Sequence, residues 1–271
     1  MTRSKLACLT LSLPLLIAAC STVPGTDRNQ LMMVPLSVEM SLGGDGYQQT
    51  LAESQGKLVT SGPDFERVQR VGQRIAEAAQ RLYPDPATRF TWEIVLIDEP
   101  KTANAWCMPG GKMAVYTGLL PITQDEESLA VVVGHEVAHA VARHGGERIS
   151  QTLAAELALM GASASMSDMD PEKRDLYLQA MVGVGTLGYI LPYSRKHESE
   201  ADELGLYLAA DAGYDPRAAI GLWERMAAKS GNQAPPEFLS THPSSASRIA
   251  HLEEVMADAM GYYEAAQGRR G

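Results

Sequence analysis

The stretch VVVGHEVAHAVARH, residues 131–144, places His135 and His139 four residues apart, with Glu136 directly after the first histidine. On an α-helix each residue turns the side-chain direction by about 100°, so both imidazoles project from one face, one turn apart. Two imidazoles in that arrangement can share a zinc ion at about 2.0–2.1 Å each, and Glu136 can reach a water molecule beside that ion. The alternative is an apolar helix whose histidines form hydrogen bonds with neighbouring side chains.

A catalytic zinc ion needs a third protein ligand, and four places in the chain offer one. His144 is nine residues from His135, so we expect it about 900° round the helix, on the opposite face. There it is interpreted as a helix C-terminal residue favoured by the helix dipole. His251 is interpreted as a surface or packing residue. The two remaining candidates are His242 and the cluster YSRKHESEAD at residues 193–202.

This cluster contains Glu198 and Asp202, which are four residues apart and therefore share one helical face. One carboxylate can bind zinc while the other accepts the free N–H of a ligating histidine and so fixes the tautomer of that ring. Glu200 lies about 200° round the helix from Glu198, so we expect it in solvent. The pattern selects Glu198 as the third ligand and Asp202 as the histidine's partner. A charged amphipathic helix without metal is the alternative.

The rest of the chain predicts mostly helix with one small sheet, which is an α+β fold. A capping box at Thr123–Glu126 is expected to open the helix that carries the two histidines. Strands are expected at 90–97 and on both sides of a Pro-Gly-Gly turn within 103–117. Further helices are expected at 64–83, 148–160, 172–190, 196–212, 216–229 and 243–260.

The first twenty residues have the pattern of an export signal. Arg3 and Lys5 precede an apolar run that ends in small residues, and this run is too short to span a bilayer as a mature helix. Its end, Ile17-Ala18-Ala19-Cys20, resembles the bacterial lipobox, which implies cleavage before Cys20 and acylation of its sulfur. A plain secretory signal with a chance cysteine is the alternative. We expect a signal peptide over 1–19, a lipidated tether and N-terminal segment over 20–50, the main domain over 51–265 and a tail over 266–271.

Composition limits the partners of the protein. The net charge of −10 argues against nucleic acid, which usually requires a basic face. Once Cys20 is acylated, Cys107 is the remaining thiol of the mature chain, which predicts no internal disulfide and a small buried apolar residue. The apolar stretch at 176–192 is interrupted by glycines and shorter than a span, so a core or interfacial helix is expected.

Several separate motifs together resemble the gluzincin metallopeptidases that include the CAAX prenyl endopeptidases and HtpX. HEVAHAVARH is followed by SRKHESEAD, which is similar to the family pattern H-E-x-x-H plus E-x-x-x-D. The segment from Asn104 to Gly111 resembles the family's strand and turn before the zinc helix, and Ser240-Thr-His-Pro243 with Arg248-Ile249 resembles its C-terminal motif. With the lipobox, the similarity points to the bacterial lipoprotein and periplasmic branch such as LoiP and BepA.

The resemblance implies a mostly helical, zincin-like domain and a zinc endopeptidase with one zinc ion per chain. Carried over by position, the metal ligands are His135, His139 and Glu198, with Glu136 as general base. Asp202 becomes the residue that anchors a ligating histidine. His242 resembles a histidine that caps the zinc in a latent state in some relatives; a role in steadying the developing oxyanion and a purely structural role stay open.

An extended substrate can be aligned by main-chain hydrogen bonds to an exposed strand edge. We predict that residues 104–108, with Asn104, Ala105 and Trp106 at their start, form that edge. The resemblance implies unfolded or misfolded outer-membrane proteins as substrates, with the outer-membrane assembly machinery as a possible partner. Ser21 after the acylated cysteine implies the outer membrane of a Gram-negative cell, facing the periplasm. The alternatives are a chaperone-like zinc module that holds such chains, and a structural lipoprotein without metal.

Overall fold

The computed structural model describes residues 20–269 except 168, 174, 176, 178, 180–190, 231–237, 239–241 and 243–245. The predicted signal peptide lies outside the described residues. So do much of the helix expected at 172–190 and all of the Ser240–Pro243 motif except His242. Within the described part, no helix is both long and apolar enough to cross a membrane.

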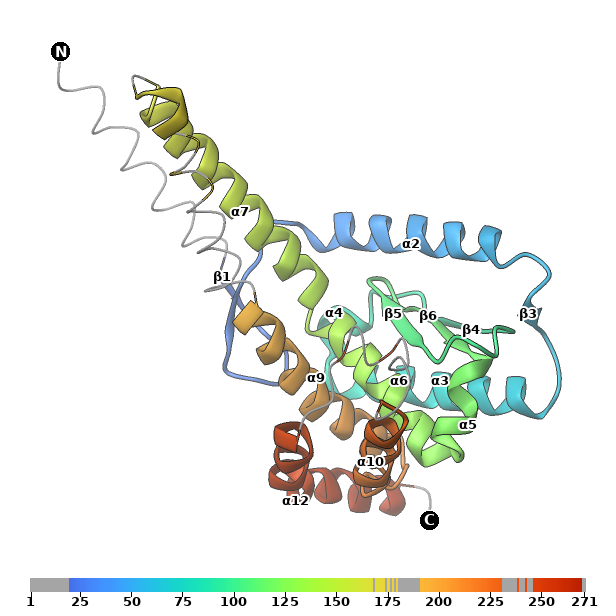
Figure 1. The fold of residues 1–271 in the computed structure, drawn as a ribbon. Coiled ribbons are helices and arrows are strands. Elements are labelled where there is room, and N and C mark those ends of the chain that lie inside the picture. The colour runs from blue at the N-terminus through green and yellow to red at the C-terminus, as the bar shows by residue number, and fades with distance from the viewer. Residues whose placement is uncertain are drawn as a thin grey trace.

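The chain forms helices packed around two small sheets (Figure 1). The strands are β1 (Cys20–Thr22), β2 (Asn29–Leu31), β3 (Leu58–Val59), β4 (Glu93–Ile97), β5 (Ala105–Met108) and β6 (Lys112–Tyr116). The helices are α2 (Leu36–Glu53), α3 (Pro63–Leu82), α4 (Pro84–Ala87), η1 (Thr117–Leu119), α5 (Leu120–Thr123), α6 (Glu126–Val141), α7 (His144–Ser165), α9 (Leu191–Asp211), α10 (Ala218–Ser230) and α12 (Ala246–Gly268). The predicted α+β class is confirmed, with two small sheets in the described residues where one was expected.

The two-stranded sheet, formed by β1 and β2, and helix α2 occupy the segment predicted as a tether. Strands β1 and β2 pair antiparallel, and β2 packs against α7. Tyr47 of α2 is buried, and its hydroxyl donates to Glu93 of β4 at 2.8 Å. Residues 20–53 therefore lie on the body of the protein.

The four-stranded sheet has the order β3-β4-β6-β5 and is covered on both faces. Successive side chains of a strand point to opposite faces. Glu93 meets Tyr47 of α2, whereas Ile94 lies against Gly72 of α3. The sheet is therefore held between α2 on one face and α3 on the other (Figure 1).

The turn between β5 and β6 depends on its glycines. Gly110 and Gly111 have φ angles of 95° and 83°, a region that residues with a Cβ rarely adopt. A Cβ on Gly111 would also lie 2.8 Å from the Trp92 ring. The expected Pro-Gly-Gly hairpin is thereby confirmed, and it leaves β5 at the edge of the sheet.

Helix α6 runs through the centre of the molecule and packs against α3, α9 and α10. Its backbone nearly touches that of α9: a Cβ on Gly134 would lie 2.5 Å from Gly205 O, and a Cβ on Gly205 would lie 2.6 Å from His135 N. Only residues without a side chain permit this approach. It brings the HEVAH motif beside the ESEAD motif.

Two expectations about α6 are wrong. The capping residue is Asp125, whose side chain accepts from Ser128 N–H at 2.7 Å, so the capping box at Thr123 does not form. The helix also stops before His144, because Arg143 adopts a left-handed φ of 59° and the chain turns there into α7. His144 therefore begins a new helix that projects from the body (Figure 1).

Candidate metal centre and active site

Helices α6 and α9 and the segment before α12 bring four ligand-type side chains to one point. Nitrogen or oxygen atoms of His135, His139, Glu198 and His242 all lie within 4.8 Å of one another. The two histidines of α6 project from one face, as their spacing predicts, and Glu198 reaches them from α9. His242 approaches from the segment before α12.

The spacing of these atoms fits a single central ion. His135 Nε2 lies 3.1 Å from His139 Nε2 and 3.5 Å from Glu198 Oε2, and His139 Nε2 lies 3.6 Å from Glu198 Oε1. Four donors at about 2.0–2.1 Å from an ion in a tetrahedron would be separated by roughly 3.3 Å. Two imidazoles and a carboxylate are also a donor set that metal ions favour. The residues therefore fit a metal ion.

His135 is oriented by a carboxylate on its far side. Its Nδ1 lies 3.0 Å from Asp202 Oδ1, and Asp202 in turn pairs with Arg248 of α12 at 2.6 Å. The Arg248 guanidinium stacks on the Trp223 ring, 3.6 Å from its centroid. Arg248 and Trp223 lie far along the chain from His135, and local spacing gave them no role here.

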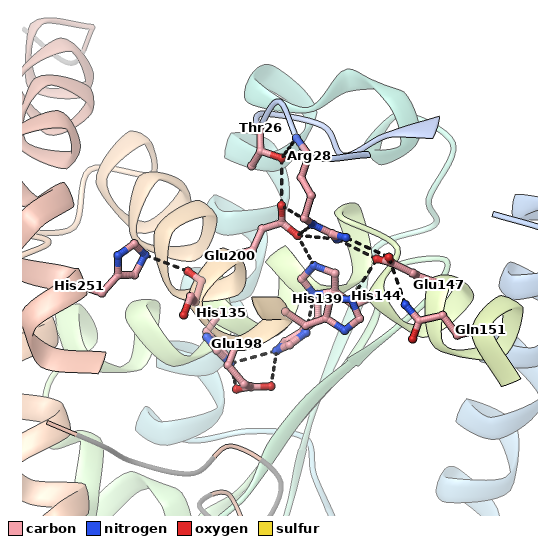
Figure 2. Close-up of polar contacts among 12 residues, drawn as sticks. Thr26, Arg28, His135, His139, His144, Glu147, Gln151, Glu198, Glu200 and His251 are labelled. Atoms are coloured by element: carbon pink, nitrogen blue, oxygen red, sulfur yellow. Dashed lines mark hydrogen bonds and ion pairs between the residues drawn. The ribbon is translucent and has the colours of Figure 1, made fainter. Parts of the chain in front are cut away.

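His139 has a different neighbour from the one the sequence suggests. His144, predicted on the opposite face, places its Nδ1 2.8 Å from His139 Nδ1, because the break at Arg143 redirects the chain. Its Nε2 lies 2.9 Å from Glu200 Oε2. The prediction that Glu200 is solvated is wrong as well, since its exposed fraction is 8%. Figure 2 shows the contacts that join Glu200, His144 and His139.

Glu136 has the surroundings of a proton acceptor. It is buried, and its Oε1 has no hydrogen-bond partner among the described residues. Burial raises the pKa of Glu136 above its ordinary value of 4.5. A raised carboxylate pKa suits a general base working near neutral pH.

His242 and Asp202 lie at opposite nitrogens of the His135 ring. Its Nδ1 is 2.7 Å from Glu198 Oε2 and 3.2 Å from His135 Nε2, and its Nε2 is 3.4 Å from Glu136 Oε1. The ring stacks on Phe238, with centroids 4.7 Å apart. His242 therefore stands where a fourth donor to the metal would stand. Its neighbours Ser240, Thr241 and Pro243 lie outside the described residues.

The charged neighbours control proton binding at the ligands. Burial would lower the pKa of His135, but hydrogen bonds to Asp202 and Glu198 raise it to about 9. Burial holds the pKa of His139 well below its usual 6.5. Burial would raise the pKa of Glu198, but hydrogen bonds from His135 and His242 lower it. The two carboxylates thus favour a proton on His135, whereas burial favours the neutral ring of His139.

The predicted substrate strand lies beside Glu136. Ala105, Trp106 and Glu136 line the same small internal cavity. Tyr116 N–H donates to Asn104 O at 3.1 Å. Hydrogen-bonded pairs alternate along an antiparallel ladder, so the backbone groups of Ala105 and Cys107 point to the sheet edge, where Ala105 N–H already donates to Asn104 Oδ1 at 2.9 Å.

One position of this edge is occupied by the segment that carries His242. Ala103 has the same parity as Ala105, and its carbonyl accepts from Phe238 N–H at 3.1 Å. Phe238 is fully buried. The same short segment thus contacts both the candidate metal ligands and the start of the strand edge. No spacing rule pointed to Phe238.

Comparison with known proteins places these features in a family. The model of peptidase family M48 matches residues 63–256, which span strands β4, β5 and β6, helices α6 and α9, and Arg248. The chain belongs to peptidase family M48. This M48 chain is 38% identical to mitochondrial metalloendopeptidase OMA1 of Schizosaccharomyces pombe over 239 residues, 88% of this chain and 66% of that one.

Two further relatives show the range of the similarity. Mitochondrial metalloendopeptidase OMA1 of Saccharomyces cerevisiae is 30% identical over 93% of the M48 chain and 76% of its own length. The beta-barrel assembly-enhancing protease of Escherichia coli is 26% identical over 88% of the chain and 47% of its own length. The M48 chain thus spans between about half and three quarters of these relatives.

Arg28 ties two buried carboxylates together behind His139. Its guanidinium donates to Glu147 at 2.8 and 2.9 Å and to Glu200 at 2.8 Å. Glu147 also lies 2.9 Å from His197 Nε2. Burial would raise the pKa of Glu147, but the hydrogen bonds from His197 and Arg28 lower it to about 2.

This lowered pKa predicts a pH-dependent contribution to stability. Because the folded pKa of Glu147 lies below its ordinary 4.5, its charge stabilises the fold above about pH 4.5, and the contribution is lost as the pH falls towards 2. Glu147→Gln breaks a buried ion pair, so we expect the free energy of unfolding to drop by about 3 kcal/mol at pH 7. Urea unfolding of the metal-free proteins should show that the difference in unfolding free energy between Glu147→Gln and wild type shrinks below pH 4.5. Glu156→Gln, at an exposed site of α7, should change little, and a pH-independent loss in Glu147→Gln would contradict the assignment.

Proposed function

We propose that the protein is a membrane-tethered zinc endopeptidase that cleaves unfolded or misfolded envelope proteins. The observation that carries this proposal is the convergence of His135, His139 and Glu198 at separations suited to one ion, with the buried Glu136 beside them. Two imidazoles with a carboxylate match the donor set of catalytic zinc in peptidases. Family membership supports peptide-bond hydrolysis.

Separate residues of the chain carry out proton transfer and hold the ligand ring. When bound, zinc supplies Lewis-acid polarisation of a scissile carbonyl and makes a water molecule more acidic. Glu136 accepts the proton of the attacking water and passes it to the leaving amine. Asp202 holds His135 through its Nδ1, which keeps the opposite nitrogen free for the metal.

Strand β5 would align the substrate. The outward-facing carbonyl of Ala105 and backbone groups of Cys107 can pair with any extended chain, because main-chain hydrogen bonds do not depend on side-chain identity. The Ala105 N–H would exchange its bond to Asn104 Oδ1 for one to the substrate. Folded proteins bury or pair their strands, so this mode favours unfolded chains. The prediction that Asn104, Ala105 and Trp106 begin the substrate strand therefore stays part of the proposal.

Membrane attachment is proposed from the N-terminus. Cys20 is exposed at the start of β1, where an acylated sulfur can reach a bilayer. Two acyl chains would hold the protein stably on a membrane. With Ser21 next in the chain, we propose the periplasmic face of the outer membrane as the location and place the protein in the bacterial lipoprotein branch. The name of the Escherichia coli relative, a beta-barrel assembly-enhancing protease, supports a link to outer-membrane assembly.

Metal content and chelation test the proposed function. The mature protein should contain about one zinc ion per chain and cleave an unfolded test protein. A strong chelator should abolish cleavage, and stoichiometric zinc should restore it. Full cleavage after verified removal of metal would overturn the proposal. Stoichiometric zinc without cleavage of any unfolded chain would favour the alternative, a chaperone-like module that holds its clients.

His242 is proposed as a latch on the metal. Its Nδ1 contacts Glu198 and its Nε2 contacts Glu136, so in this conformation it occupies the place where substrate and water must enter. His242→Ala is expected to raise the initial rate of cleavage several-fold while zinc stays bound. The rate on an unfolded fluorogenic protein measures this, with His251→Ala, which lies on α12 with a part-exposed ring, as the control. A large fall in rate with zinc retained would instead assign His242 a catalytic role.

A further inference from the structure

We propose that Arg28, in the N-terminal segment, is a positioning residue for the metal ligand His139, acting through Glu200 and His144. The inference rests on the proposed metal site. It concerns how the second histidine ligand is held, and it makes the segment after Cys20 a working part of that site.

The two histidine ligands are supported in different ways. Behind His135 the support is direct, since Asp202 Oδ1 lies 3.0 Å from its Nδ1. Behind His139 the neighbour is another ring, His144 Nδ1, at 2.8 Å. A carboxylate appears only one step later, where His144 Nε2 meets Glu200 Oε2 at 2.9 Å.

The metal-binding role of His139 determines which atom donates in each of these hydrogen bonds. To bind a metal through Nε2, neutral His139 must carry its proton on Nδ1. It then donates to Nδ1 of His144, which must accept. The proton of His144 is therefore on Nε2 and is donated to Glu200, whose carboxylate only accepts. Glu200 thus selects the tautomer of His144, and His144 selects that of His139.

Glu200 itself is held from the N-terminal segment. Thr26 donates its hydroxyl to Oε1 at 2.9 Å, and Arg28 donates to both carboxylate oxygens at 2.8 to 3.2 Å. Figure 2 shows this sequence from Arg28 through Glu200 and His144 to His139. The Nη1 and Nη2 atoms of Arg28 also donate to the two carboxylate oxygens of Glu147. The guanidinium therefore has a fixed orientation.

The position of Arg28 in the sequence links the N-terminal segment to the metal site. Arg28 lies between β1 and β2, eight residues after Cys20. The segment that would carry the lipid therefore reaches the back of the metal site. Pulling β1 and β2 away would remove the cation that orients Glu200, and His139 would lose its fixed tautomer and ring angle.

The test compares zinc affinity of the full mature chain by competition with a chromophoric chelator, together with the absorption spectrum of the cobalt-substituted protein. Losing the outer partner of a metal ligand typically weakens metal binding about 10- to 100-fold, and we expect this for His144→Ala. His144→Asn keeps an acceptor near Nδ1 but loses Glu200, so a smaller loss is expected. Arg28→Met keeps much of the volume and should weaken zinc binding in the same direction, with shifted cobalt bands.

Ser150→Ala is the matched control. Ser150 accepts from Met33 N–H at 2.8 Å and so holds the same N-terminal segment without touching the chain to His139. It should leave zinc affinity and cobalt bands unchanged. Wild-type affinity and spectrum in folded Arg28→Met and His144→Asn would overturn the inference while leaving the proposed function intact. A wild-type protein that binds neither zinc nor cobalt would overturn both.

Discussion

Glu136→Gln is expected to reduce cleavage of an unfolded protein by a factor of about 100 to 10,000, the range that a positioned general base contributes. The substitution preserves the shape of the side chain but removes its ability to accept a proton. The residue is buried with its Oε1 unpartnered among the described residues, and its pKa is raised by burial. All of these properties suit a base. A glutamine in the same place cannot accept the proton.

The loss should occur without loss of metal. His135, His139 and Glu198 are unchanged in this variant, so zinc stoichiometry should stay near one per chain. Cleavage is followed by the appearance of fragments over time, and metal by atomic spectroscopy. Glu127→Gln, on the first turn of the same helix and partly exposed, serves as control. Undiminished cleavage by Glu136→Gln would refute the mechanism.

Gly205→Ala is expected to lower the free energy of unfolding by about 3 kcal/mol, the upper part of the usual range for overpacking. The added Cβ would lie 2.6 Å from His135 N and 2.7 Å from His135 Cα. These are backbone atoms and cannot rotate away, so α6 and α9 must separate. Glu198 would then move away from the histidines, and zinc affinity should fall as well.

Gly161→Ala provides the control for this effect. Gly161 lies in α7, and a Cβ there meets no atom within 4 Å. Alanine in an open helical site should stabilise by about 0.5–1 kcal/mol. Urea unfolding of the two metal-free variants measures the difference in their unfolding free energies. Competition for zinc measures the loss of affinity expected when Glu198 moves away. Equal stability of Gly205→Ala and wild type would show that the two helices do not touch as described.

Local spacing predicted what lies on a single helix. His135 and His139 share a face because they are four residues apart, and the same rule pairs Glu198 with Asp202. The strand, Pro-Gly-Gly turn and strand before α6 were predictable for a similar reason, since turn chemistry is local. The α+β class follows from these elements.

Some of the wrong predictions are local, such as the capping box at Thr123, and others concern contacts between distant segments. The expected position of His144 depends on a helix that continues through Arg143, and the sequence carries no signal for a left-handed arginine. Glu200 was assigned to solvent from its own helix alone, whereas Arg28, 172 residues earlier, is its partner. Trp223, Phe238 and Arg248 likewise meet the site only in three dimensions.

The Arg248–Asp202 pair has a consequence for the order of synthesis. Asp202 holds His135, but its charge is balanced by a guanidinium that lies 46 residues later in the chain. A nascent chain that has emerged only as far as α9 already carries His135, His139 and Glu198, yet its Asp202 lacks this counterion. Docking of α12 therefore supplies the counterion of Asp202, so the surroundings of His135 form only after the chain has been synthesised through Arg248.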